Sequence, residues 1–198
     1  MLAVLMLVAV FAMSACSESS IEEGNENEYE PEELTGVNST AVVYFSATGN
    51  TKQVAEYIAK ATGGDLYEIQ SEHTYTDEDL DYTKDDCYVK EEQDNPYCRP
   101  GMVDTFVNTN EYDVIYLGYP IWYGTEPRII DTWLEESETA DHTIIPFCTS
   151  ASSGIEASVE SMKDIADDGT NFDPGMRFAA TATYDDVKAW TDTLHYDN

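Results

Sequence analysis

Small polar side chains of the kind that bind an anion gather in the stretch SATGNT, which spans residues 46–51. The side-chain donors in it are Ser46, Thr48, Asn50 and Thr51. Gly49 permits a close approach of the backbone or a left-handed turn. An apolar segment precedes this stretch and a helical pattern follows it, so free N–H groups and a helix dipole would face the same anion. The residues therefore predict a phosphate-binding loop that needs no lysine.

Other common site patterns are missing from the sequence. The loop does not match G-x-x-x-x-G-K-[ST] or G-x-G-x-x-G, so neither ATP nor a dinucleotide is the expected ligand. The histidines are scattered and no Cys-x-x-Cys occurs, which argues against a metal site. The stretch Ser150–Gly154 lacks the first glycine of a G-x-S-x-G nucleophile motif, which argues against a hydrolase.

Two further loops follow apolar strands and carry residues suited to a planar ligand. The strand expected at Asp113–Gly118 leads into the first of them, and the strand that begins at Thr143 leads into the second. The first loop contains Pro120, Ile121, Trp122, Tyr123 and Gly124. The second contains Thr149, Ser150, Ser152 and Gly154. Loops after parallel strands meet at one edge of a doubly wound sheet, so these two loops should border one ligand.

Together these loops resemble the flavodoxin family. SATGNT fits every position of the family's phosphate loop, [ST]-x-T-G-x-T, and GYPIW resembles the loop that lies against the flavin ring. The resemblance implies an FMN-binding protein. Its phosphate site would comprise Ser46, Ala47, Thr48, Gly49, Asn50 and Thr51. Trp122 or Tyr123 would stack on the ring, and Thr149, Ser150, Ser152 and Gly154 would border its other edge.

Alternating strands and helices position these loops. They predict one α/β domain over residues 39–198, with a doubly wound, five-stranded parallel sheet covered by helices on both faces. The family resemblance implies the strand order 2-1-3-4-5. The other strands are expected at Ala41–Phe45, Leu66–Ile69 and Arg177–Thr181. Helices are expected at Thr51–Ala61, Pro127–Glu136, Ile155–Ala166 and Tyr184–Leu194.

The segment Ser71–Glu111 is acidic, rich in tyrosine and irregular. A short helix is expected at Asp85–Asp94, followed by extended chain because Pro96 and Pro100 prevent a continuous helix. The run from residue 77 to residue 81 does not fit a calcium loop, since tyrosines stand at residues 82 and 88, where the template requires Gly and Glu. A solvated acidic face is the better interpretation of this run.

Residues 1–15 at the amino terminus are apolar and uncharged and end in small residues before Cys16. This pattern resembles a bacterial lipoprotein signal, in which Cys16 would become the lipidated first residue of the mature chain. The basic residues that usually open a signal peptide are missing. Residues 16–38 are rich in Glu, Asn and Ser and predict a flexible tether. The expected location is the extracytoplasmic face of a bacterial membrane.

The chain is strongly acidic, with 40 acidic and 9 basic residues and a formal charge of −31. This charge repels nucleic acid and favours either a redox partner with a basic docking face or solubility in a salty or acidic habitat. Outside the cytoplasm Cys87 and Cys98 have the opportunity to form a disulfide, while Cys148 is expected as a buried thiol. No pattern sets the oligomeric state.

The favoured function is FMN-mediated electron transfer by a lipid-anchored protein. One alternative is an FMN-dependent NAD(P)H or quinone oxidoreductase, which would require a substrate pocket over the exposed flavin face. Another is a lipoprotein that has lost the cofactor and acts as a binding module, against which the intact loop at residues 46–51 argues.

Overall fold

The computed structural model describes residues 39–103 and 107–196. The predicted signal at residues 1–15, the tether at residues 16–38 and the lipidation site at Cys16 lie outside the described residues. None of the helices in the described ranges is long and apolar enough to cross a membrane.

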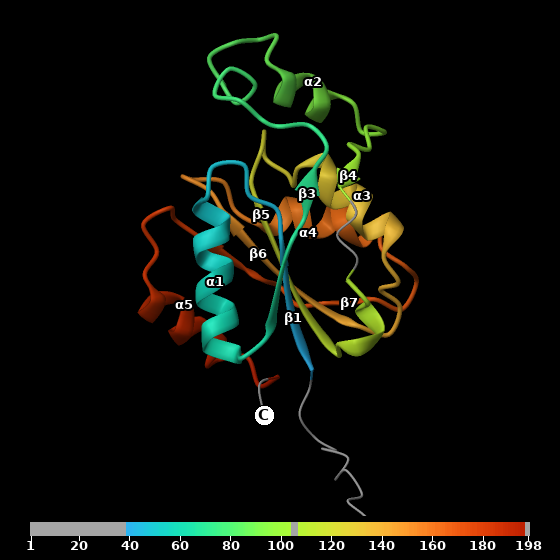
Figure 1. The fold of residues 1–198 in the computed structure, drawn as a ribbon, viewed down its shortest axis with the longest axis vertical. Coiled ribbons are helices and arrows are strands. Elements are labelled where there is room, and N and C mark those ends of the chain that lie inside the picture. Colours follow the sequence, from blue (N-terminus) through green and yellow to red (C-terminus); the bar gives the residue numbers. More distant parts are fainter. Residues whose placement is uncertain (1–38, 104–106, 197–198) are drawn as a thin grey trace, which may run out of the picture. The chain divides into compact units, whose positions relative to one another are not determined.

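A parallel sheet forms the centre of the fold, in the strand order β2-β1-β5-β6-β7 (Figure 1). This order confirms the predicted 2-1-3-4-5 arrangement. Apolar residues fill the central strands, as expected where a sheet is covered on both faces. The first four strands in chain order along this sheet are β1 (Thr40–Tyr44), β2 (Asp65–Glu68), β5 (Val114–Pro120) and β6 (Thr143–Thr149).

The fifth position of the sheet differs from the prediction. A single strand was expected at Arg177–Thr181, but two short strands, β7 (Asn171–Phe172) and β8 (Met176–Phe178), both pair with β6. The sheet therefore has six strands. Pro174 and Gly175 separate the two pieces, and Gly175 has a φ of 76° that a regular strand does not adopt.

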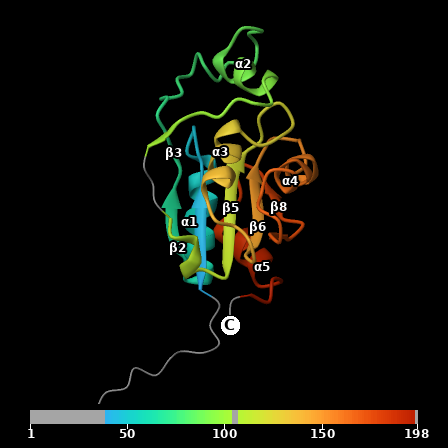
Figure 2. The same cartoon turned by 90° about the vertical axis from the view of Figure 1, so that its right-hand side faces the viewer.

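Helices cover both faces of the sheet, with α1 and α5 on one face and α3 and α4 on the other (Figure 2). Each face has its own apolar core, which confirms the doubly wound architecture. Apolar helix residues buried against the sheet include Val54, Ile58, Trp133, Val159 and Val187. The helices are α1 (Asn50–Thr62), α3 (Arg128–Glu136), α4 (Glu156–Lys163) and α5 (Tyr184–Thr191).

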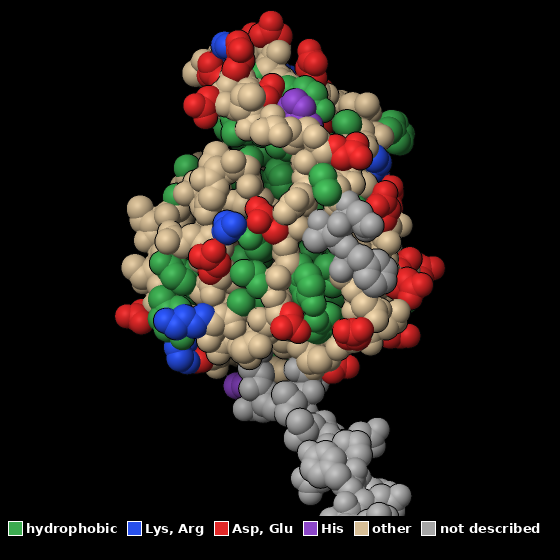
Figure 3. Space-filling view, in the orientation of Figure 1, with side chains coloured by type: hydrophobic (Ala, Val, Ile, Leu, Met, Phe, Trp, Pro, Cys, Tyr) green, Lys and Arg blue, Asp and Glu red, His purple; other side chains and the backbone are tan. Residues whose placement is uncertain are grey.

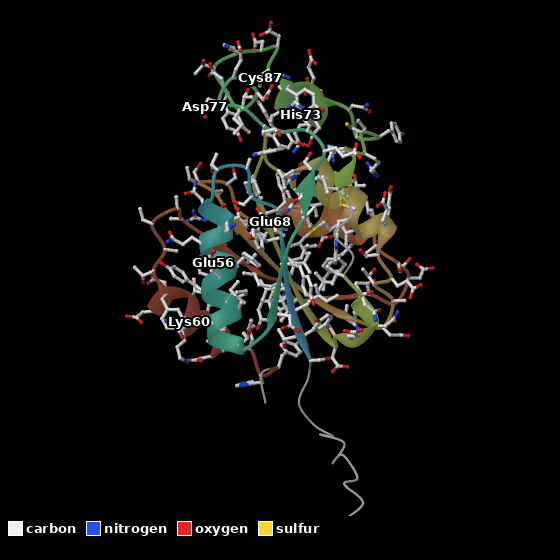
Figure 4. The ribbon with its side chains drawn as sticks, viewed as in Figure 1. Glu56, Lys60, Glu68, His73, Asp77 and Cys87 are labelled. Atoms are coloured by element: carbon white, nitrogen blue, oxygen red, sulfur yellow. The ribbon has the colours of Figure 1, made fainter. Side chains whose placement is uncertain are left out.

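A long connection leaves and rejoins the domain through a small antiparallel ribbon that the sequence did not predict. The ribbon pairs β3 (Gln70–Ser71) with β4 (Met102–Val103), and we call residues 72–101 the β3–β4 connection. Its helix α2 (Tyr88–Asp94) begins three residues later than predicted. His73, Asp77 and Cys87 lie in this connection, far from Lys60 on α1 (Figure 4). A short 3-10 helix, Thr109–Glu111, then leads into β5.

The surface of the β3–β4 connection carries many carboxylates (Figure 3). Asp77 and Glu78 of the predicted acidic run are exposed, whereas Asp79 and Asp81 of the same run are half-buried, so the prediction of a solvated acidic face is confirmed only in part. Asp85 and Asp86, beyond the run, are also exposed. Cys87 and Cys98 are both free thiols in the structure, so the disulfide considered for them is not formed. Cys148 is a buried free thiol on β6, as predicted.

Candidate functional site

The predicted phosphate loop lies between the end of β1 and the start of α1. Gly49 caps the helix with a φ of 86°, which confirms the predicted left-handed turn. The Gly49 N–H donates to the hydroxyl of Ser46 at 3.1 Å, and the Asn50 side-chain amide donates to the hydroxyl of Thr48 at 3.2 Å. Thr48, Gly49 and Asn50 are exposed, so this turn presents its polar groups and the amino end of a 13-residue helix to solvent.

The hydroxyl of Thr51, also predicted to face the phosphate, has another contact. It lies 2.8 Å from the hydroxyl of Thr149 at the end of β6, and both side chains are buried. This hydrogen bond ties the first turn of α1 to the strand that carries the third predicted loop. Thr51 therefore links two of the site's loops.

The second predicted loop contains a tight turn over Trp122–Thr125. The N–H of Trp122 donates to the carbonyl of Thr125 at 2.9 Å, and the reverse bond measures 3.1 Å. Both central residues, Tyr123 and Gly124, have positive φ angles, of 48° and 98°. This is the geometry of a hairpin turn of type I′. Pro120, predicted as part of the loop, is the last residue of β5.

This turn buries one of its two large aromatic side chains and exposes the other. Trp122 is 3% exposed and packs against Phe45 and Tyr75, with ring centroids 5.5 Å and 5.0 Å away. Tyr123 is 45% exposed at the tip of the turn. The sequence left open which of the two faces the ligand, and the structure makes Tyr123 the more accessible of the two.

The third predicted loop is fixed at its start by its neighbours. The carbonyl of Thr149 accepts from the N–H of Ile121 at 3.0 Å, and the carbonyl of Ser150 accepts from the guanidinium of Arg177 at 2.9 Å. The hydroxyl of Ser150 donates to the carbonyl of Ser153. Because these bonds connect β5, β6 and β8, the loop is held at the carboxyl ends of three adjacent strands.

One cavity of about 770 Å³ brings the three loops together. The predicted residues that line it are Thr48, Asn50, Pro120, Ile121, Trp122, Tyr123, Gly124, Thr149, Ser150 and Ser152. Ser46, Ala47, Gly49, Thr51 and Gly154 were also predicted for the site but do not line this cavity. Sequence reasoning missed Leu80, Tyr82, Ala151, Ser153 and Ala180, which do line it. All the lining residues belong to the described part of the chain, and none of them carries a charge.

The β3–β4 connection holds the tight turn through hydrogen bonds from Gln93 on α2. The buried side-chain amide of Gln93 donates to the carbonyl of Trp122 at 3.3 Å and to that of Glu126 at 2.8 Å. The backbone carbonyl of Gln93 in turn accepts from the guanidinium of Arg128 at 3.1 Å. No periodicity or motif marks Gln93, so only the structure reveals this role.

Two buried carboxyl groups follow the same turn. The pKa of Glu126 is raised to about 7, chiefly by burial and also by the neighbouring Asp131, while the hydroxyl of Ser161, 2.6 Å away, acts in the opposite direction. Burial also raises the pKa of Asp131, against the effect of Arg128 at 3.1 Å and Arg99 at 3.5 Å. The interaction between the two carboxyl groups raises the pKa of Glu126 and lowers that of Asp131, so Glu126 is the one of the two that takes up a proton more readily.

Comparisons with known proteins agree with this geometry. Two structures described as putative flavoproteins, from Bacteroides uniformis and Bacteroides eggerthii, are 37% and 34% identical to this chain, with TM-scores of 0.73 and 0.71. They cover 79% of this chain each and 99% and 98% of their own. A flavoprotein from Lactobacillus acidophilus, solved in complex with FMN, is 27% identical, with a TM-score of 0.61 over 78% of this chain and 99% of its own.

No curated protein matches the chain. The family model for flavodoxin matches residues 39–194, which is nearly the whole of the described fold. With the strand order, the loop at residues 46–51 and the similarity to the two Bacteroides structures, this match places the chain in the flavodoxin family.

Proposed function

We propose that this protein binds FMN and transfers electrons through it. The observation that carries the proposal is the uncharged cavity of about 770 Å³ at the carboxyl ends of the parallel strands, in a chain whose formal charge is −31. A cavity of this size is typical of small-molecule and cofactor sites, which span roughly 300–1,000 Å³. The FMN complex of the similar Lactobacillus acidophilus flavoprotein supports the choice of ligand.

The residues at one end of the cavity fit a phosphate group. Thr48 and Asn50 line the cavity where α1 begins, and the left-handed Gly49 has open space where a Cβ atom would stand. A phosphate there would meet hydroxyl and amide donors, backbone N–H groups and the positive end of the α1 dipole. No carboxylate among the lining residues opposes the anion.

The other end of the cavity fits a planar ring. Tyr123 offers an accessible aromatic face, while Ile121 and Pro120 add apolar surface beside it. The loop at residues 149–153 closes the cavity from β6. FMN supplies the redox chemistry when it is bound, and these residues orient its ring and exclude water from one side of it.

Titration with FMN and riboflavin tests this assignment. The purified protein should bind both ligands, and Thr48→Ala should weaken FMN by roughly 10- to 150-fold, because a charge-assisted hydrogen bond contributes about 1.5–3 kcal/mol. Riboflavin lacks the phosphate, so its affinity should change little. Flavin fluorescence quenching measures both affinities, and Thr193→Ala, at an exposed position after α5, is the matched control.

Two results would contradict the proposal in different ways. A protein that is still colourless after incubation with excess FMN and removal of the unbound FMN is not a flavin protein. An equal loss of FMN and riboflavin affinity in Thr48→Ala would remove the phosphate assignment and leave the flavin assignment in place. Steady-state turnover of NADH with a quinone, without single-electron exchange with a protein partner, would favour an oxidoreductase over the proposed carrier.

The acidic surface supports docking with a redox partner that has a basic face. Acidic residues outnumber basic ones by more than four to one, with 40 against 9. Attraction between exposed charges is screened within about 8 Å at physiological ionic strength, so electron exchange with such a partner should slow as salt is added. A rate that does not depend on salt would argue against this docking mode.

Lipid anchoring at Cys16 completes the proposal and rests on the amino-terminal sequence alone. The change Cys16→Ser removes the thiol that a lipid would modify, so the protein should lose its lipid and leave the membrane fraction of the native host. Metabolic labelling with a fatty acid, together with membrane fractionation, measures both effects. Cys98→Ser is the control, and equal membrane retention of the parent and Cys16→Ser would refute the anchor.

A further inference from the structure

An aromatic side chain from the β3–β4 connection reaches the cavity and meets Tyr123. The rings of Tyr82 and Tyr123 have centroids 5.1 Å apart and are tilted by 53°. Both side chains are large and apolar over most of their surface, yet Tyr82 is 52% exposed and Tyr123 is 45% exposed. Tyr82 and its neighbour Leu80 line the same cavity as Tyr123. Aromatic surface left open beside a cavity is typical of a ligand contact.

The position of Tyr82 is defined by contacts at several points along the connection. The Tyr75 ring packs against Trp122, and the thiol of Cys87 lies 3.5 Å from the hydroxyl of Tyr123. Gln93 holds the tight turn through two carbonyls, as described above. The connection is thus attached to the turn that carries Tyr123, so Tyr82 and Tyr123 belong to one packed unit.

Two carboxylates near Tyr82 in the sequence are engaged within the connection itself. Asp81 accepts from the hydroxyl of Thr83 at 2.6 Å, and Glu78 accepts from the ammonium of Lys84 at 2.8 Å. Leu80 and Tyr82 line the cavity and no carboxylate of the segment does, so the connection presents an uncharged surface to the cavity although the segment itself is acidic. Such a surface favours a planar aromatic group over an anion.

We propose that Leu80 and Tyr82 form, with Tyr123, an apolar wall of the flavin-ring site, so that the β3–β4 connection is part of the cofactor site. This inference rests on the proposed function. The tilt and the short separation of the two tyrosine rings leave no room for a ligand between them. The two rings therefore act as one continuous wall, against which the ring of the flavin lies.

The test compares two tyrosines of the same connection. Tyr82→Ala should weaken FMN and riboflavin to the same extent, by roughly 2- to 12-fold, because the wall contacts the ring that both ligands share. Tyr82→Phe keeps the aromatic face and should bind like the parent. Tyr97 is 87% exposed and does not line the cavity, so Tyr97→Ala is the matched control and should leave both affinities unchanged.

Fluorescence titration of these variants, with circular dichroism to verify folding, separates this inference from the proposed function. If the parent binds flavin and Tyr82→Ala binds it equally well, the wall is refuted while the flavin site stands. A loss confined to FMN would also refute the wall, because it would place Tyr82 at the phosphate. If the parent binds neither ligand, the proposed function fails and the wall fails with it.

Discussion

Trp122→Ala should lower the free energy of unfolding by about 3–5 kcal/mol, the usual cost of truncating a large buried aromatic side chain. The indole is almost fully buried against Phe45 and Tyr75, so its removal leaves a cavity between the end of β1 and the β3–β4 connection. The tight turn loses its apolar anchor at the same time, and FMN and riboflavin should both bind more weakly. Urea denaturation followed by far-UV circular dichroism measures the loss of stability.

Tyr123→Ala is the contrasting variant. The Tyr123 side chain is half exposed at the tip of the same turn, so its truncation should change stability by no more than about 0.5 kcal/mol. Flavin binding should nevertheless weaken, because an accessible ring face is lost. If Trp122→Ala were as stable as the parent, Trp122 would not be the core residue that its contacts indicate.

Glu126→Gln should stabilise the protein above neutral pH and have little effect near pH 4.5. The folded protein raises the pKa of Glu126 from 4.5 to about 7, chiefly through burial, so between these values the folded state keeps a proton that the unfolded chain releases. The contribution of Glu126 to the free energy of unfolding of the parent is therefore fully present below about pH 4.5 and is lost as the pH rises to 7. The loss corresponds to about 3 kcal/mol.

Glutamine avoids this loss because it is neutral at every pH. Its carbonyl can accept from Ser161 and its amide can donate to Asp131, so both contacts of Glu126 survive. Unfolding free energies of the parent and Glu126→Gln, measured at pH 4 and pH 8, should differ mainly at the higher value. Glu91→Gln, on the exposed side of α2, is the control. A difference that is the same at both pH values would refute the buried proton.

The parts of the fold that the sequence predicted are those with local signals. The buried strands β1, β5 and β6 read as apolar runs, and each leads into a loop that lines the cavity. The turn at residues 46–51 between β1 and α1 was predictable because hydroxyls, a glycine and a helix start stand next to one another in the chain. Proximity in sequence thus located most of the candidate site.

The parts that escaped prediction depend on distant or very short pairings. β7 and β8 have two and three residues, too few for a hydrophobic alternation to appear. The positive φ of Tyr123 was equally hidden, since glycine or asparagine is the residue expected at such a position. Tyr82 and Gln93 reach the site only because the β3–β4 connection folds back onto the tight turn, and no local pattern in the sequence records that contact.

The ribbon of β3 and β4 closes the β3–β4 connection into a separate loop. Gln70 pairs with Val103 and Ser71 with Met102, and the Glu72 N–H donates to the Gly101 carbonyl at 2.9 Å, so the segment starts and ends at the same place. Each doubling of a loop's length costs only about 0.6 kcal/mol in closure entropy. The length of the segment between residues 72 and 101 can therefore change at little entropic cost to the central sheet, provided that the residues packed on the tight turn are kept. The surface beside the tight turn can thus vary through this one segment while the central sheet stays the same.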